Sequence, residues 1–163
     1  MCKKYAGLSF LQVSDDFSDE ITKICILKLH NIEDAKDCFQ NVFLKLHLTD
    51  TVFKDEQHLK AWLIRVACNE CNDFNRSYWK RKVNLGAGPE IYKEFTDDFE
   101  CIELIELIRS LPQKYREIIY LYYYKEYTTA EIAKTLKLNV NTVKSRLLRA
   151  RDKLAGIMKE DEN

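Results

Sequence analysis

The stretch "TTAEIAKTLKLNVNTVKSRLLRAR", residues 128–151, contains two helix-start signals separated by a short turn. Thr128 is followed three residues later by Glu131, a capping box that predicts the start of the first helix. After the turn "KLN", Asn139 is a favourable N-cap for a second helix. Two helices joined by so short a turn predict a helix-turn-helix unit.

The second helix of this unit divides into an inward and an outward face. At about 100° per residue, one apolar stripe is formed by Val143, Leu147, Ala150 and Leu154. The opposite face has short polar groups in its centre and cations on both sides, which suits a helix lying in a DNA groove between two phosphate ridges. The predicted contacts are Asn141, Thr142, Lys144, Ser145, Arg146, Arg149 and Arg151. An ordinary helical hairpin with a charged outer face remains an alternative.

Charge is segregated along a chain of zero net charge, with 26 basic and 26 acidic residues. Residues 76–82 and 137–153 are strongly basic, whereas residues 90–106 contain seven acids and one lysine. Because screening makes the field near a patch local, a nucleic-acid partner is compatible with the neutral total. Three unrelated solvated faces would give the same composition.

The domain organisation follows from the positions of helix breakers. Apolar periodicity is helical almost throughout, and the one cluster of breakers is Gly86, Gly88 and Pro89. We therefore predict an all-α chain with two small domains, 1–83 and 104–163, joined by a flexible acidic linker, 84–103. The linker could fold against a basic patch and suppress DNA binding in the free protein, or it could be a solvated tether.

The same sequence disfavours a metal-binding protein, an enzyme and a membrane-spanning protein. "CNEC", residues 68–71, has metal-like spacing, but no second CxxC or HxxxH accompanies it, so buried reduced thiols are the favoured interpretation for the six cysteines. No metal or other cofactor is predicted. No glycine-rich phosphate loop is present, and the three histidines stand apart from any nucleophile, so catalysis is not predicted. The longest apolar run, residues 118–124, is far shorter than a membrane span of about 20 residues.

Residues 111–154 closely resemble region 4 of the sigma-70 family, and they look most like its extracytoplasmic-function group. The motifs that carry the resemblance are "LP-x-x-YRE" at the start and "TVKSRL-x-RAR" at the end. The resemblance implies that the second helix reads a minus-35 promoter element. Lys137 stands where the family usually has a turn glycine, and a left-handed backbone there would cost about 1 kcal/mol.

The first half resembles sigma region 2 in two segments. Residues 31–47 read as a helix capped by Asn31, with an inner stripe of Ala35, Phe39, Val42 and Leu46. They are similar to the family's "DAEDLVQE-x-F" segment, which implies core RNA polymerase binding. The residues to which this role carries over are Asp34, Asp37, Gln40 and Asn41, with Asn41 replacing the usual acid. A solvated acidic helix face is the alternative.

Residues 58–82 form the second such segment. The family pattern is present as Trp62, Leu63, Val66, Ala67, Asn69, Asp73 and Arg76. The resemblance implies that this helix and the loop 49–57 hold the separated strand of the minus-10 element, and aromatics beside cations suit unstacked bases. The predicted contacts are Phe53, Lys54, Trp62, Asn69, Asp73 and Arg76. Residues 1–19 receive no assignment, and the family's first helix looks shortened.

The resemblance implies an alternative sigma factor of a bacterial cytoplasm that is not itself an enzyme. It would bind core RNA polymerase and promoter DNA, with an anti-sigma protein as a regulatory partner. A polymerase-independent helix-turn-helix regulator is an alternative that would treat residues 20–83 as an oligomerisation or sensing domain. A structural helical adaptor would explain the amphipathic stripes but not the spacing of the cations.

Overall fold

The computed structural model describes residues 2–29, 31–81 and 102–162, and it confirms the predicted all-α class. Within these ranges the backbone forms no strand, and its one isolated β-bridge joins Tyr5 to Leu8. No helix in the described part combines the length and apolar character that a bilayer crossing requires.

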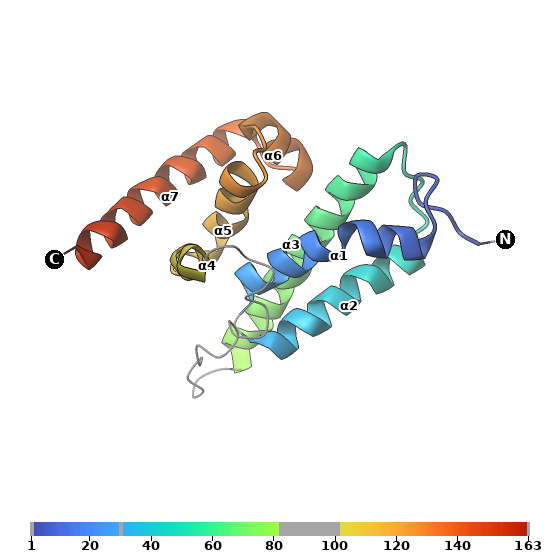
Figure 1. Cartoon of the computed structure of the whole chain (residues 1–163), viewed down its shortest axis with the longest axis horizontal. Coiled ribbons are helices and arrows are strands. Elements are labelled where there is room, and N and C mark those ends of the chain that lie inside the picture. The colour runs from blue at the N-terminus through green and yellow to red at the C-terminus, as the bar shows by residue number, and fades with distance from the viewer. Residues whose placement is uncertain (1, 30, 82–101, 163) are drawn as a thin grey trace. The chain divides into compact units, whose positions relative to one another are not determined.

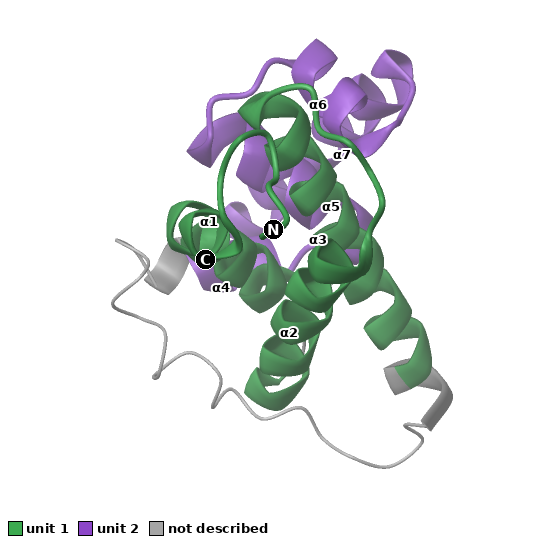
Figure 2. Ribbon diagram, turned by 90° about the vertical axis from the view of Figure 1, so that its right-hand side faces the viewer, with its two compact units in different colours: residues 1–98 green, residues 99–163 purple. Residues whose placement is uncertain are grey.

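The chain divides into two compact units, Met1–Asp98 and Phe99–Asn163, which Figure 2 shows in different colours. Most of the predicted linker, 84–103, lies outside the described residues. The hypothesis that this linker covers a basic patch therefore concerns a part of the chain that the structure does not describe. Helix α4 includes the last two residues of that linker, because it begins at Ile102.

Unit 1 contains a bundle of three helices, α1 (Phe10–Lys28), α2 (Ile32–Leu48) and α3 (Glu56–Arg81), each of which contacts the other two (Figure 1). Asn31 caps α2, as predicted, by accepting a hydrogen bond from the Asp34 amide at 2.7 Å. The core consists of apolar side chains from all three helices, among them Val13, Ile21, Ile24, Val42, Leu46, Leu59, Leu63 and Ile64.

The sequence pattern gives no assignment for residues 1–19, whereas in the structure α1 begins at Phe10. Ser9 forms a capping box with Gln12: its Oγ accepts from the Gln12 amide at 3.2 Å, and its own amide donates to Gln12 Oε1 at 2.8 Å. The preceding turn has positive φ at Ala6 and Gly7 and buries the ring of Tyr5. The amino-terminal segment is therefore part of the folded unit.

Unit 2 contains α4 (Ile102–Arg109), α5 (Gln113–Ile119), the π-helix η3 (Tyr120–Tyr124), α6 (Thr129–Leu136) and α7 (Val140–Asp161). Helices α5 and α6 both pack against α7 (Figure 1). The core between them includes Tyr115, Ile118, Ile119, Leu121, Ile132, Ala133, Val143, Leu147 and Ala150.

The π-helix extends α5 by one wider turn. The Lys125 amide donates to the Tyr120 carbonyl at 3.2 Å, five residues back, and the rings of Tyr120 and Tyr124 stack at 5.3 Å. Such a turn contains one residue more than an α-helical turn. It therefore changes which side chains of the "YLYYY" run face α7.

Lys137 ends α6 in the left-handed conformation, with φ 54° and ψ 47°. Replacing Lys137 with glycine removes the Cβ penalty of this conformation, so we expect a gain of about 1 kcal/mol in the free energy of unfolding. In a unit of this size, that gain raises Tm by about 4–8 °C in calorimetry of the full chain. The control Lys134→Gly, at an exposed interior position of α6, should lower stability by about 1 kcal/mol. A lower Tm for Lys137→Gly would contradict the assignment of strain to this residue.

Candidate nucleic-acid interface

The turn between α6 and α7 is built by three local devices. The predicted capping box is confirmed: Thr128 Oγ1 accepts from the Glu131 amide at 3.1 Å, and the Thr128 amide donates to Glu131 Oε2 at 2.8 Å. The Leu138 amide donates to the Ala133 carbonyl at 2.9 Å across the left-handed residue. Asn139 then caps α7 through its Oδ1, which accepts from the Asn141 amide at 2.8 Å.

The inward face of α7 holds the helix in one rotational setting. Val143, Leu147 and Ala150 are buried, as the sequence pattern predicts, and Leu154 is half-buried. They pack with Ile132 and Ala133 in the core of unit 2. Because a rotation of α7 would expose this stripe, the residues opposite it are held toward solvent.

The outward face carries the predicted DNA contacts. Asn141, Ser145 and the flanking cations Lys144 and Arg149 are exposed. Thr142 and Arg146 are half-buried at the edge of the face, and Leu148 is exposed in its centre. The Ser145 hydroxyl donates to the Thr142 carbonyl at 3.0 Å, which leaves its lone pairs available as acceptors. Short polar groups between cations are thus presented together on one helix face.

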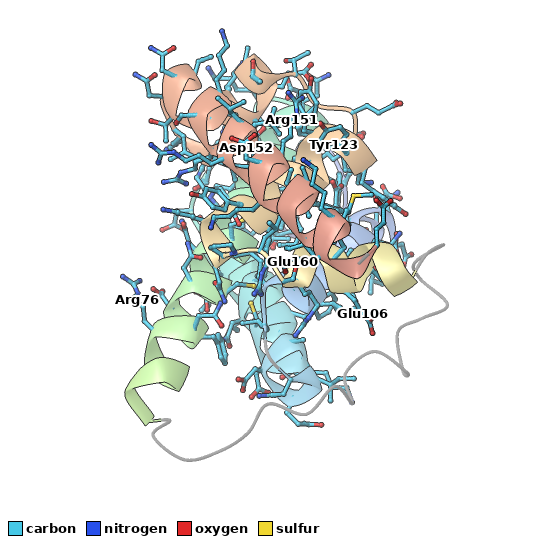
Figure 3. The ribbon with its side chains drawn as sticks, turned by 90° about the vertical axis from the view of Figure 1, so that its left-hand side faces the viewer. Arg76, Glu106, Tyr123, Arg151, Asp152 and Glu160 are labelled. Carbon is cyan, nitrogen blue, oxygen red and sulfur yellow. The ribbon has the colours of Figure 1, made fainter. Side chains whose placement is uncertain are left out.

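Arg151 differs from the other predicted cations, because two tyrosines of η3 hold it. Figure 3 labels Arg151 and Tyr123, and the Arg151 Nε donates to the Tyr123 hydroxyl at 2.5 Å. The Arg151 guanidinium also lies 5.3 Å from the centre of the Tyr122 ring. The bond to Tyr123 raises the pKa of Arg151 above its ordinary value. The contact of Tyr122 and Tyr123 with Arg151 was not predicted from the sequence. The aromatic run that contains them is equally typical of a buried core segment.

The predicted minus-10 contacts lie on α3 and in the loop before it. Asn69 is exposed, and so are Asp73 and Arg76, which form an ion pair three residues apart. Trp62 is half-buried, with its ring 5.5 Å from that of Phe53. Phe53 is only 6 % exposed, so in this conformation its ring supports the loop from the core side.

A hollow of about 520 Å³ lies between this loop and the amino-terminal segment. The residues that line this hollow are Lys3, Lys4, Ala6, Gly7, Asp50, Thr51, Val52, Phe53 and Lys54. The ammonium of Lys3 donates to the carbonyls of His47, at 3.2 Å, and of Thr49, which attaches the segment to the end of α2. Three lysines therefore surround a space large enough for a planar ring. The position of Lys3 and Lys4 beside this hollow was not predicted from the sequence, because no local pattern connects them to residues 50–54.

The four residues predicted to bind polymerase lie on α2 in two different environments. Asp37 and Gln40 are exposed, whereas Asp34 and Asn41 are half-buried. Asp34 Oδ2 accepts from the Asn31 side-chain amide at 3.0 Å. Asn41 donates to the buried Glu70 of α3 at 3.4 Å, beside the ion pair of Lys45 with the same carboxylate. Asp34 and Asn41 thus also have structural roles within unit 1.

Comparison with known proteins gives matches over both units. The family described as "Sigma-70 region 2" matches residues 15–81, and the family described as "Sigma-70, region 4" matches residues 101–154. The chain is 29 % identical to the ECF RNA polymerase sigma factor SigW of Bacillus subtilis (strain 168), covering 90 % of this chain and 87 % of that protein. It is 26 % identical to RNA polymerase sigma factor SigV of the same strain, covering 83 % and 82 %.

Two solved structures share the fold. CnrH, determined in complex with the cytosolic domain of CnrY, matches with a TM-score of 0.67 and 22 % identity, covering 93 % of this chain and 88 % of that one. The sigma factor RpoE from Bartonella quintana, determined with the anti-sigma factor NepR, matches with a TM-score of 0.66 and 19 % identity, covering 92 % and 96 %.

Proposed function

Because the chain belongs to the sigma-70 family, in its extracytoplasmic-function group, we propose that each unit carries one half of promoter recognition. The protein is an alternative sigma factor, which directs core RNA polymerase to promoters and initiates transcription. Unit 1 binds polymerase and the minus-10 element, and unit 2 binds the minus-35 element. The protein supplies recognition, and it needs no catalytic chemistry of its own.

The observation that supports the minus-35 assignment is the outward face of α7. Asn141 and Ser145 offer short donors and acceptors to base edges, while Lys144 and Arg149 can meet the phosphates on either side. Arg146 and Arg151 extend the cationic edges, although Arg151 must leave Tyr123 to reach a phosphate. We thus assign recognition of the bases to the polar side chains in the centre of the face, and positioning of the helix on the DNA backbone to the cations.

The minus-10 assignment rests on α3 and the hollow beside residues 50–54. An extruded base can enter the hollow while Lys3, Lys4 and Lys54 attract its backbone phosphates. Asn69 and Arg76 on α3 are exposed and available to the neighbouring nucleotides. Trp62 then acts mainly through Phe53, by holding the loop in place.

Polymerase binding is assigned to the exposed acids and amides of α2, with Asp37 and Gln40 as the direct contacts. Regulation by an anti-sigma protein in the cytoplasm is proposed by analogy with the two structural neighbours, both of which were determined in complex with a second protein. A polymerase-independent regulator is disfavoured, because it would leave the region 2 match at residues 15–81 without a purpose.

Mixing the full chain with core RNA polymerase and separating the products by size tests this function most directly. We expect a stable complex that starts transcription at specific promoters. A chain that binds promoter DNA alone, and never elutes with polymerase, would support the regulator instead.

Substitutions on α7 should separate base reading from phosphate contact. Arg149→Ala should weaken binding of the polymerase complex to all promoters alike and lower the slope of log affinity against log salt by about one. Asn141→Ala should change base preference at one or two positions, at a cost of about 1–3 kcal/mol for the preferred base. The measurement is binding to a library of minus-35 variants at several salt concentrations. Equal losses on every sequence after Asn141→Ala would contradict this division.

A further inference from the structure

Three buried cysteines meet in the centre of unit 1, one from each helix: Cys25 of α1, Cys38 of α2 and Cys71 of α3. Their Sγ atoms all lie within 4.8 Å of one another, and those of Cys38 and Cys71 are 3.4 Å apart. Each side chain is at most 1 % exposed. None of the residues assigned above to promoter or polymerase binding belongs to this cluster.

We propose that Cys25, Cys38 and Cys71 form a binding site for one thiophilic d10 metal ion, Cu(I) or Zn(II), which links the three helices of unit 1. A metal–sulfur bond of about 2.3 Å places three sulfurs around one ion roughly 4 Å apart. The observed separations lie close to that spacing, so only small side-chain movements are needed. The thiols release S–H protons to the buffer on coordination, and no electrons are transferred.

The surroundings of the cluster can offset part of the charge of the thiolates. Lys28 is fully buried, and its ammonium donates to Asn72 Oδ1 at 2.8 Å. Hydrogen bonds from Cys25 and Cys71 lower the pKa of Cys38 to about 5; Lys28 also lowers it, against the opposing effects of burial and of Glu70. The same cluster raises the pKa of Cys25, chiefly through Cys38, and that of Cys71, chiefly through burial. The buried ammonium of Lys28 can thus offset part of the negative charge that thiolates would bring to the cluster.

The number of ligands and their charge favour different members of this metal class. In the described part of the chain no fourth cysteine, histidine or carboxylate joins the set, and structural zinc is nearly always four-coordinate, which favours Cu(I). Three thiolates beside one ammonium would be neutralised by a divalent ion, which favours Zn(II). Both ions share the chemistry of a soft, all-sulfur site.

Metal titration of the full chain tests the proposal. The protein is reduced and treated with a chelator, and separate samples then receive Cu(I) without oxygen or Zn(II). We expect one tightly held equivalent of one of these ions, counted after buffer exchange, with a thiolate-to-metal absorption band. At about 100 times its Kd, the ion should raise the Tm of unit 1 by on the order of 10 °C.

Two alanine substitutions on α3 form a matched pair, made in a Cys2→Ser background that removes the one exposed thiol among the described residues. Cys71→Ala should lose the bound equivalent and the Tm increase, whereas Cys68→Ala, buried one turn earlier and outside the set, should keep both. If Cys71→Ala does not fold, Cys38→Ser replaces it with the same expectation. The proposal is overturned by failure of both ions to bind, by equal retention in Cys71→Ala and Cys68→Ala, or by loss of two free thiols to a disulfide without bound metal.

Discussion

Asp37→Lys is expected to abolish stable binding of core RNA polymerase by the full-length chain. Asp37 is exposed on α2, on the segment assigned to the polymerase interface. If the opposing surface is cationic, the substitution replaces attraction with like-charge opposition, which costs several kcal/mol at an interface. Since each 1.4 kcal/mol is tenfold in affinity, we expect a loss of at least about 100-fold, with a parallel loss of promoter-specific transcription.

The structure identifies Asp37 as a cleaner position for this test than Asp34. Asp34 accepts a hydrogen bond from the N-cap residue Asn31, so reversing its charge would also weaken the start of α2. Asp16→Lys is the matched control, because it makes the same change in net charge at an exposed position of α1. Unchanged circular dichroism with wild-type polymerase affinity in Asp37→Lys would remove this face from the interface.

Leu63→Ala is expected to remove a large part of the stability of unit 1. Leu63 is completely buried in α3, and truncating a buried leucine leaves a cavity that costs about 2–5 kcal/mol. That cost approaches the entire stability of a small domain, which begins near 5 kcal/mol. Polymerase binding should fall with the folded fraction. Unit 2 is a separate compact unit, so DNA binding through the contacts proposed for α7 should persist.

The control for this prediction is Leu44→Ala, because Leu44 lies on α2 with 55 % of its surface exposed. The free energy of unfolding of the Leu44→Ala variant should differ from that of the wild type by less than about 0.5 kcal/mol. Denaturant titrations of both variants, monitored by circular dichroism, provide the comparison. Equal destabilisation by the two substitutions would mean that Leu63 is not the core residue that its burial indicates.

Features that depend on neighbouring residues could be predicted from the sequence. The caps at Asn31, Thr128 and Asn139 were predicted, since an N-cap bonds an amide two or three residues away. The inward stripe of α7 was also predicted, because helical periodicity is local. For the same reason, the outward position of Asn141 followed directly.

Features that depend on residues far apart in the chain were not predicted. The ring of Phe53 lies 6.5 Å from that of Tyr5, and no local pattern connects these two residues. The cysteine cluster is a second case. "CNEC" contributes Cys71 to a cluster completed by Cys25 and Cys38, which lie too far away in the sequence to form a CxxC or HxxxH pattern with it.

The π-helix has a consequence for the evolutionary history of the chain. One residue inserted into an α-helix is accommodated as a π-turn, and every residue before it is then rotated by about 100° relative to those after it. Relatives that lack the insertion should be aligned with a one-residue gap inside the "YLYYY" run, although helices are usually aligned without gaps. In such an alignment, we expect the hydrogen bond between Tyr123 and Arg151 to have been gained together with the extra residue.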